Sequence, residues 1–127
     1  MFSFVKANAK PEFPVIKTLP TTASTEYKIG DALILSGGGL VKATGTTKPE
    51  YIAAANYSAP ATGMEPLPAY LIAPGMEWET TFAADATAVT VGTKVTIHTD
   101  GAQVTATATS GVAQILKKHG TGAAGTK

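Results

Sequence analysis

The sequence of 127 residues contains no cysteine and no arginine, and it has two histidines. The absence of cysteine excludes a disulfide framework and any metal site built on thiolates. Ten lysines face nine acidic residues, for a net charge of +1, so the composition argues against a basic surface for nucleic acid. No apolar run approaches the ~20 residues that a membrane-spanning helix needs. We therefore expect no metal, no cofactor, no direct nucleic-acid partner and no membrane contact.

Large apolar side chains are also scarce. Leu, Ile, Val and Phe together provide 26 residues, whereas Ala, Thr and Gly provide 22, 20 and 13. A core built largely from Ala and Thr methyl groups is thin, and such a domain gains stability from oligomerisation or from docking onto a larger body. Lys6 follows closely on the apolar residues Met1–Val5, which leaves no room for the apolar region of a secretory signal. We expect synthesis in the cytoplasm of a host cell.

From residue 26 the chain alternates apolar and polar residues with a period of two, which is typical of β-strands. Glycine- and proline-containing turns separate these runs. No segment predicts a convincing helix, and residues 56–68 are expected to form a loop because they contain three prolines. The sequence thus predicts an all-β fold, either a small β-barrel or a β-sandwich. Strands are expected at Ala32–Leu35, Leu40–Thr44, Tyr51–Ala55, Ala69–Ala73, Met76–Phe82, Ala88–Val91, Lys94–Thr99, Gln103–Thr107 and Val112–Leu116.

The first 25 residues are expected to form an extended N-terminal arm. Three prolines oppose a helix there. One interpretation is a frayed terminus, and the other is an arm that lies along a neighbouring subunit. We favour the second because three phenylalanines within thirteen residues are unusual for a solvated tail. We expect a β domain over residues 26–118 and a flexible, glycine-rich tail over 119–127. The apolar anchors of the arm are Phe2, Phe4, Phe13, Val15 and Ile16.

Two stretches of the sequence resemble each other at an offset of 62 residues. Tyr27–Leu35 and Val89–Ile97 share the pattern apolar-x-apolar-Gly-x-x-apolar-x-apolar, and each leads into a glycine-containing turn. One interpretation is a duplicated β-unit, in which the glycine lets the strand bend before the hairpin. The other is chance, because hairpins rich in Val, Thr and Gly resemble one another readily.

No group of residues indicates catalysis more strongly than a structural role. Glu77 and Glu79 fall on one face of the same expected strand, and paired carboxylates serve acid–base chemistry in glycosidases, but two solvated glutamates on an exposed sheet face explain them better. His98 lacks a partner at metal-ligand spacing. Gly37–Gly39 lacks the lysine and the helix of a phosphate-binding loop. We expect no catalytic, cofactor-binding or metal-binding residues, and a protein that is not an enzyme. Trp78 is expected either to fill the core or to anchor an interface.

The chain resembles the head decoration proteins, or capsid cement proteins, of tailed bacteriophages. The resemblance rests on the proline-rich stretch Lys10–Pro20, on Tyr27–Leu33 before a glycine-rich turn, on Leu40–Thr44 with Tyr51–Ala55, and on the hairpin Val95–Thr107 with its Asp100-Gly101 turn. It is one of pattern and composition, and it covers most of residues 10–118. The resemblance implies a mostly β protein that binds the outer surface of an expanded icosahedral capsid.

Members of that family commonly act as trimers. They bridge neighbouring major capsid subunits and stiffen the shell against the pressure of the packaged DNA. The resemblance therefore implies a homotrimer, the major capsid protein as partner, and a place on the outside of the virion. From the residues themselves we expect the capsid or subunit contacts to involve Phe2, Phe4, Phe13, Val15, Ile16 and Trp78.

Two other classes stay open. A carbohydrate-binding or adhesin module on a virion or cell surface would need a row of exposed aromatic rings, which Tyr51, Tyr57, Tyr70 and Trp78 could supply. A small enzyme would need a pocket with strongly perturbed titratable groups, for which the sequence offers few candidates. A phage tail or neck protein is close to the decoration protein in what the sequence predicts.

Overall fold

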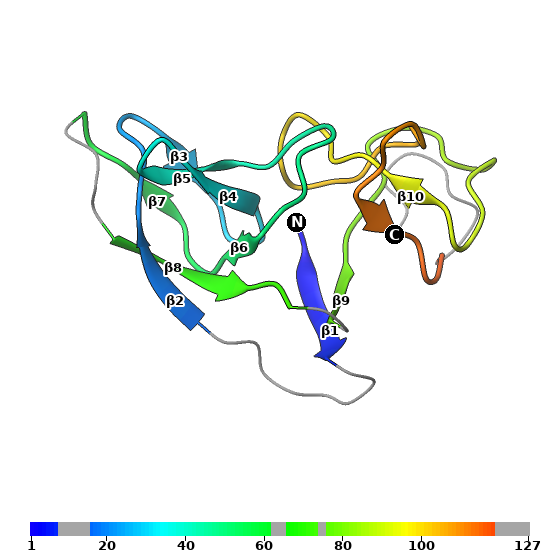
Figure 1. The fold of residues 1–127 in the computed structure, drawn as a ribbon, viewed down its shortest axis with the longest axis horizontal. Helices are drawn as coiled ribbons and strands as arrows, with labels where there is room; N and C mark the ends of the chain where they lie inside the picture. Colours follow the sequence, from blue (N-terminus) through cyan, green and yellow to red (C-terminus); the bar gives the residue numbers. More distant parts are fainter. Residues whose placement is uncertain (8–15, 62–65, 74–75, 119–127) are drawn as a thin grey trace.

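The computed structural model describes residues 1–7, 16–61, 66–73 and 76–118, and within them it is all-β, without a helix (Figure 1). A five-stranded antiparallel sheet has the order β2-β8-β6-β4-β5, and three two-stranded sheets pair β1 with β9, β3 with β7, and β10 with β11. This confirms the predicted fold class. The strands are β1 (Ser3–Ala7), β2 (Ile16–Pro20), β3 (Glu26–Tyr27), β4 (Ala32–Ser36), β5 (Gly39–Lys42), β6 (Tyr51–Ala53), β7 (Tyr57–Ser58), β8 (Pro66–Leu71), β9 (Met76–Glu79), β10 (Lys94–Val95) and β11 (Ala113–Gln114).

None of the sheets in the described residues closes into a barrel. The two outer strands of the large sheet approach each other at a single parallel bridge between Thr21 and Leu40. The buried Tyr27 hydroxyl reinforces this contact. It accepts a hydrogen bond from the Thr22 N–H (2.8 Å) and donates one to the Leu40 carbonyl (2.5 Å). The large sheet is therefore curled towards closure and held by side-chain bonds where a barrel would have a continuous ladder.

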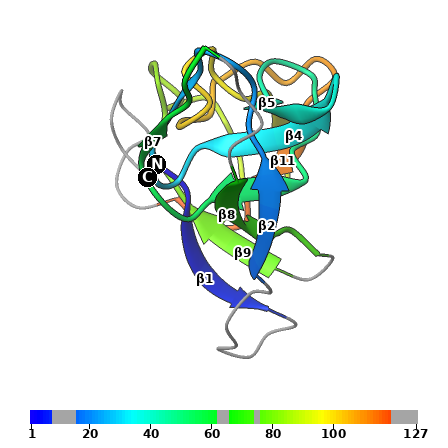
Figure 2. The same cartoon turned by 90° about the vertical axis from the view of Figure 1, so that its left-hand side faces the viewer.

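The described parts of the first 25 residues pair with strands of the same chain. β1 lies antiparallel to β9, and β2 lies antiparallel to β8 as an edge strand of the five-stranded sheet. Figure 2 shows both pairs. Phe13 and Val15, two of the expected anchors, lie outside the described residues. The two described segments of the expected arm thus contribute strands to this chain's own sheets.

The two similar stretches of sequence adopt the same local structure. In the first, the turn Lys28–Asp31 leads from β3 into β4, and in the second the turn Thr90–Thr93 leads into β10. Each turn closes with a hydrogen bond from its fourth N–H to its first carbonyl, at 3.0 and 3.1 Å. Each has its glycine at the third position, Gly30 with φ 88° and Gly92 with φ 96°, which is where a type II turn requires a positive φ. We call residues 27–55 the first repeat and residues 89–117, at the offset of 62, the second repeat, so that each includes the strand paired with its turn-and-strand unit.

The strand that pairs with each repeat recurs as well. The Gly30 N–H donates to the Ala53 carbonyl (2.9 Å), and the Gly92 N–H donates to the Ile115 carbonyl (2.7 Å), again 62 residues on. The register of β4 with β6 returns at the same offset in β10 with β11. Chance similarity between hairpins does not explain a shared register in a third strand, so the repeated geometry favours a duplicated β-unit.

Two of the expected strands are wrong. Ala88–Val91 forms turns, because the Val89 N–H donates to the Ala86 carbonyl (3.0 Å) and the Gly92 turn follows at once. Residues 103–107 form no continuous strand: Val104 makes two isolated bridges, one with Phe82 and one with Ile97. There the Thr105 hydroxyl accepts a bond from the Thr107 N–H (3.0 Å), so a side chain competes with the strand ladder for a backbone group.

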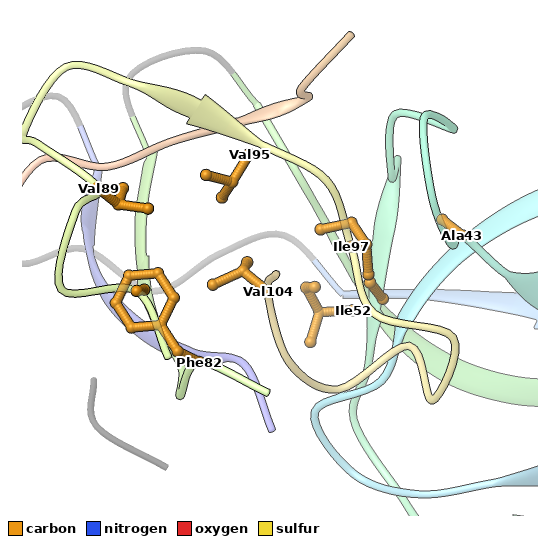
Figure 3. Packing of buried hydrophobic residues seen from close by; sticks show 9 residues of the cluster. Ala43, Ile52, Phe82, Val89, Val95, Ile97 and Val104 are labelled. Atoms are coloured by element: carbon orange, nitrogen blue, oxygen red, sulfur yellow. The ribbon is translucent and has the colours of Figure 1, made fainter. Parts of the chain in front are cut away.

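The buried residues form two clusters. The smaller packs on one face of the five-stranded sheet around Tyr27 and Leu33. The larger contains Ile52 of the first repeat together with Val95, Ile97 and Val104 of the second. Figure 3 shows Ile52, Ile97 and Val104 close together, with Phe82 and Val89 further to the left in the view. The larger cluster therefore joins the two repeats through a common core.

Candidate binding groove

A groove of about 770 Å³ opens over the larger cluster. Its lining includes residues of the β1–β9 pair, the residue after β8, the Lys48-Pro49 turn and the segment around β11, together with Ile52, Phe82, Ile97 and Val104 of the larger cluster. Apolar side chains dominate this lining. The most prominent are Phe2, Ile72, Trp78, Val112, Ile115 and Leu116.

Trp78 is positioned by strand pairing and by two ring contacts. It stands on β9 opposite Phe4 of β1, and the two rings meet edge to face at 5.4 Å with an interplanar angle of 76°. The Tyr70 ring lies on another side at 6.1 Å. Such aromatic contacts fix the ring orientation and add to the energy of apolar burial. Trp78 is accordingly a rigid part of the groove wall.

The indole Nε1 of Trp78 is buried, and it has no hydrogen-bond acceptor among the residues that the structure describes. An unsatisfied buried donor typically costs about 1–3 kcal/mol. Because the atom is enclosed by the surrounding protein, what the groove itself offers is chiefly its apolar lining.

Charges of both signs lie along the groove. Glu77 and Glu79 of β9 line it, as do Lys48 and Lys117. The two glutamates are both partly exposed, and both take part in interactions within the protein. With two groups of each sign, the groove has no strong net charge to select a charged ligand.

The structure places the described members of the expected contact residues in two different regions. Phe2, Phe4 and Trp78 come together at the β1–β9 pair, and Phe2 and Trp78 pack against the larger cluster. The Trp78 side chain packs against the core, one of its two expected places, and it also lines the groove. Ile16 begins β2, is 58% exposed, and lies opposite Tyr70 in the strand register.

The aromatic rings named for a glycan-binding surface do not stand in one exposed row. Tyr51 and Tyr57 pack against the smaller cluster, while Tyr70 and Trp78 pack against the larger one. All four are partly buried. The aromatic surface on which a sugar ring would stack is therefore divided between two parts of the molecule.

Asp100 and His98 lie together in a turn. Asp100 accepts hydrogen bonds from the N–H of Ala102 (2.8 Å) and from the side-chain amide of Gln103 (2.9 Å), and its Oδ1 lies 3.3 Å from the His98 Nδ1. Partial burial raises the pKa of Asp100, but the bonds from Ala102, the Gln103 side chain and His98 outweigh it and lower the pKa overall. The pair thus closes the tight turn after Ile97.

The described residues hold no group of three or more His, Asp or Glu side chains placed to bind a metal ion. They also contain no helix long and apolar enough to cross a membrane.

Sequence reasoning missed the groove itself. The sequence predicts only ordinary short strands for the segments that contain Ile72, Val112, Ile115 and Leu116. Their meeting depends on how the two repeats pack together. The one available signal was the repeat, whose offset of 62 residues also relates Ala53 to Ile115 and so points to the segment that lines the groove.

No family model matches the sequence, and no curated protein or solved structure matches it either.

Proposed function

We propose that this chain is a structural virion protein that binds the outer surface of an icosahedral phage capsid and stabilises the shell by bridging major capsid subunits. The pattern of residues that resembles head decoration proteins motivates the proposal, and the all-β fold is compatible with it. The single observation that supports it most is the apolar groove of about 770 Å³ that opens over the larger cluster. Such a surface is suited to holding part of another protein.

Exposed apolar side chains outside the groove add to this support. Ile16, Ile29, Leu35 and Val91 are all exposed. A decoration protein makes weak contacts that recur over a whole lattice, so that avidity replaces a single tight site. Scattered apolar side chains of this kind are also available for contacts between subunits of the proposed homotrimer.

The pairing of β1 with β9 and of β2 with β8 changes how the role of the N-terminal arm must be tested. Deleting residues 1–19 would remove β1, its contacts to Trp78, and nearly all of β2. Loss of capsid binding in that variant would then reflect a damaged fold. We therefore propose that the first residues support the groove, and that docking is tested on the intact chain.

The test is co-sedimentation of the purified protein with expanded, undecorated phage heads, with the bound mass measured per shell. The proposal expects saturable binding at a copy number related to the icosahedral lattice, and a multiple of three chains at each site for a trimer. A protein that leaves cognate shells bare at saturating concentration would contradict the proposal. Binding of the same protein to a glycan array would then favour the carbohydrate-binding alternative.

A further inference from the structure

The outer edge of β6 in the first repeat is covered by β8. Ile52 lies opposite Tyr70, the Ile72 N–H donates to the Glu50 carbonyl (2.9 Å), and the Ala54 N–H donates to the Pro68 carbonyl (3.0 Å). β6 thus uses both of its edges, one for β4 and one for β8.

The corresponding edge of the second repeat has no covering strand in the part of the chain that is described. β11 occupies the place of β6, and its one sheet neighbour there is β10. By the offset of 62 residues, Val112, Gln114 and Leu116 stand where Glu50, Ile52 and Ala54 stand in the first repeat. Their edge-facing backbone groups are the Val112 carbonyl, both groups of Gln114 and the Leu116 N–H. An open strand edge of this kind is a template for pairing with another chain.

The open edge and the groove are continuous. Val112, Gln114 and Leu116 all line the groove, and so does Trp78. A strand added along β11 would place alternate side chains over the apolar floor.

Within the first repeat, the covering strand indicates what kind of segment fits. β8 and the residue after it read Pro-Leu-Pro-Ala-Tyr-Leu-Ile, without a charged side chain. The two lysines and two glutamates along the groove balance each other, so charge favours no ionised segment. The occupant expected at β11 is therefore an extended, apolar, uncharged stretch of polypeptide.

We propose that the edge Val112–Leu116 binds an extended apolar segment of a partner protein as an antiparallel strand, in the way that β6 binds β8. Under the proposed function, on which this identification of the partner rests, the segment belongs to the major capsid protein. Strand addition supplies affinity through the main chain and specificity through alternate side chains.

The direct test uses a synthetic peptide with the sequence of residues 66–72, blocked at both ends and extended by two lysines for solubility. Titrated into the ¹⁵N-labelled full chain, it is expected to shift the amide resonances of residues 112–116 and the indole N–H of Trp78. Trp78 is the single tryptophan, so its fluorescence reports the same event. A control peptide, methylated on alternate backbone nitrogens, is expected to leave these signals in place. No shift with the first peptide, or shifts confined to other strands, would overturn the proposal.

Two variants of one residue separate the backbone edge from its side chain. Gln114→Pro and Gln114→Ala both lose the side-chain bond to the Gly92 carbonyl (3.2 Å), but only the proline removes the edge N–H. The proline variant is expected to bind the peptide about tenfold more weakly than the alanine variant. Equal affinity in two folded variants would contradict strand addition.

Leu116→Glu keeps the proposal testable if the proline variant fails to fold. Leu116 is 55% exposed and lines the groove, whereas Val91 is 61% exposed and lies on the turn before β10. Leu116→Glu is expected to weaken peptide binding, and Val91→Glu is expected to leave it unchanged. Equal effects from the two substitutions would count against the edge.

Co-sedimentation with expanded heads, run in parallel, distinguishes this inference from the proposed function. Shell binding by the wild type and Gln114→Ala, but not by Gln114→Pro, supports both the decoration function and the role of the β11 edge. Equal binding by all three keeps the decoration function and overturns the role of the edge. Peptide binding without any shell binding keeps the strand-accepting edge and removes the capsid as its partner.

Discussion

Asp31 is a buried carboxyl group within the turn that precedes β4. It is 2% exposed, its Oδ2 accepts a hydrogen bond from the Lys28 N–H (3.0 Å), and the Lys42 Nζ lies 3.9 Å away. Burial raises the pKa of this carboxyl above its ordinary value of 3.8. The Lys28 bond, Lys42 and the terminal amino group oppose that rise, and Asp100 adds to it. A carboxyl that the fold needs for its turn thus carries a penalty when it ionises.

The raised pKa makes the stability of the protein depend on pH in a defined direction. The folded state holds the Asp31 proton more tightly than the unfolded state does, so this contribution is fully present below pH 3.8 and is lost as the pH rises through the folded pKa. Asp31→Asn keeps an oxygen acceptor for the turn and cannot ionise. We expect the wild type to gain stability relative to this variant as the pH falls from 7 towards 3. Urea unfolding of both proteins at several pH values measures the difference.

Asp85→Asn is the matched control, because its effect has the opposite sign. Hydrogen bonds from the Thr87 backbone and side chain lower the pKa of Asp85, so its contribution is present above pH 3.8 and is lost as the pH falls. As the pH falls from 7 towards 3, the wild type is expected to lose stability relative to Asp85→Asn. Over the same pH range it is expected to gain stability relative to Asp31→Asn. A stability difference for Asp31→Asn that does not change with pH would contradict the assigned burial.

At the level of elements, Gly111 decides whether β11 can lie against β10. A Cβ added to Gly111 would stand 2.1 Å from the Lys94 carbonyl oxygen and 2.6 Å from the Val95 nitrogen, both of them backbone atoms. Backbone cannot give way as a flexible side chain can. The strand β11, and with it the open edge of the groove, therefore depends on a residue that has no side chain.

Gly111→Ala is expected to destabilise the protein by more than about 2 kcal/mol, because the strand pair must separate to admit the methyl group. The matched substitution is Gly92→Ala, at a glycine with φ 96° and open space around it. That change carries only the backbone cost of a positive φ, about 1–2 kcal/mol. Thermal unfolding of the two variants compares them. A larger loss for Gly92→Ala would show that the close approach at Gly111 is relaxed in solution.

The strand pattern was predictable wherever apolar alternation was strong. Ala32–Leu35 and Tyr51–Ala55 were expected and correspond to β4 and β6. The prolines Pro66 and Pro68 predict a loop over residues 56–68, yet both lie in β8. Pro68 uses only its carbonyl, which accepts from Ala54, and proline has no N–H to leave unpaired. Composition alone does not reveal which backbone groups a strand must supply.

The meeting of segments far apart in sequence was less predictable than the segments themselves. Phe4 and Trp78 were each expected as contact residues, but their ring contact requires β1 to pair with β9. The repeat was visible because its glycines must take positive φ, which restricts the residue type. The joint core of the two repeats had no such signal, because any Val or Ile would satisfy the pattern.

For the whole molecule, the larger cluster makes the two repeats one cooperative unit. Ile52 of β6 is 2% exposed and packs in the same cluster as Val95 and Ile97. Trp78 and Ile115 pack against that cluster from the two sides of the groove. Neither repeat can therefore unfold without exposing apolar surface of the other.

Ile52→Ala tests this coupling. Removing a buried isoleucine side chain typically costs about 2–5 kcal/mol. The loss is expected in both repeats at once, although the substitution lies in the first. Trp78 fluorescence and the far-ultraviolet circular dichroism of the strands are expected to report coincident urea transitions in the wild type and in the variant, with the variant's midpoint lower. Ile29→Ala, at an exposed position of the first turn, serves as control and is expected to leave the midpoint nearly unchanged. Two separate transitions in the variant would mean that each repeat folds on its own core. The groove between them would then be a contact of two independent units.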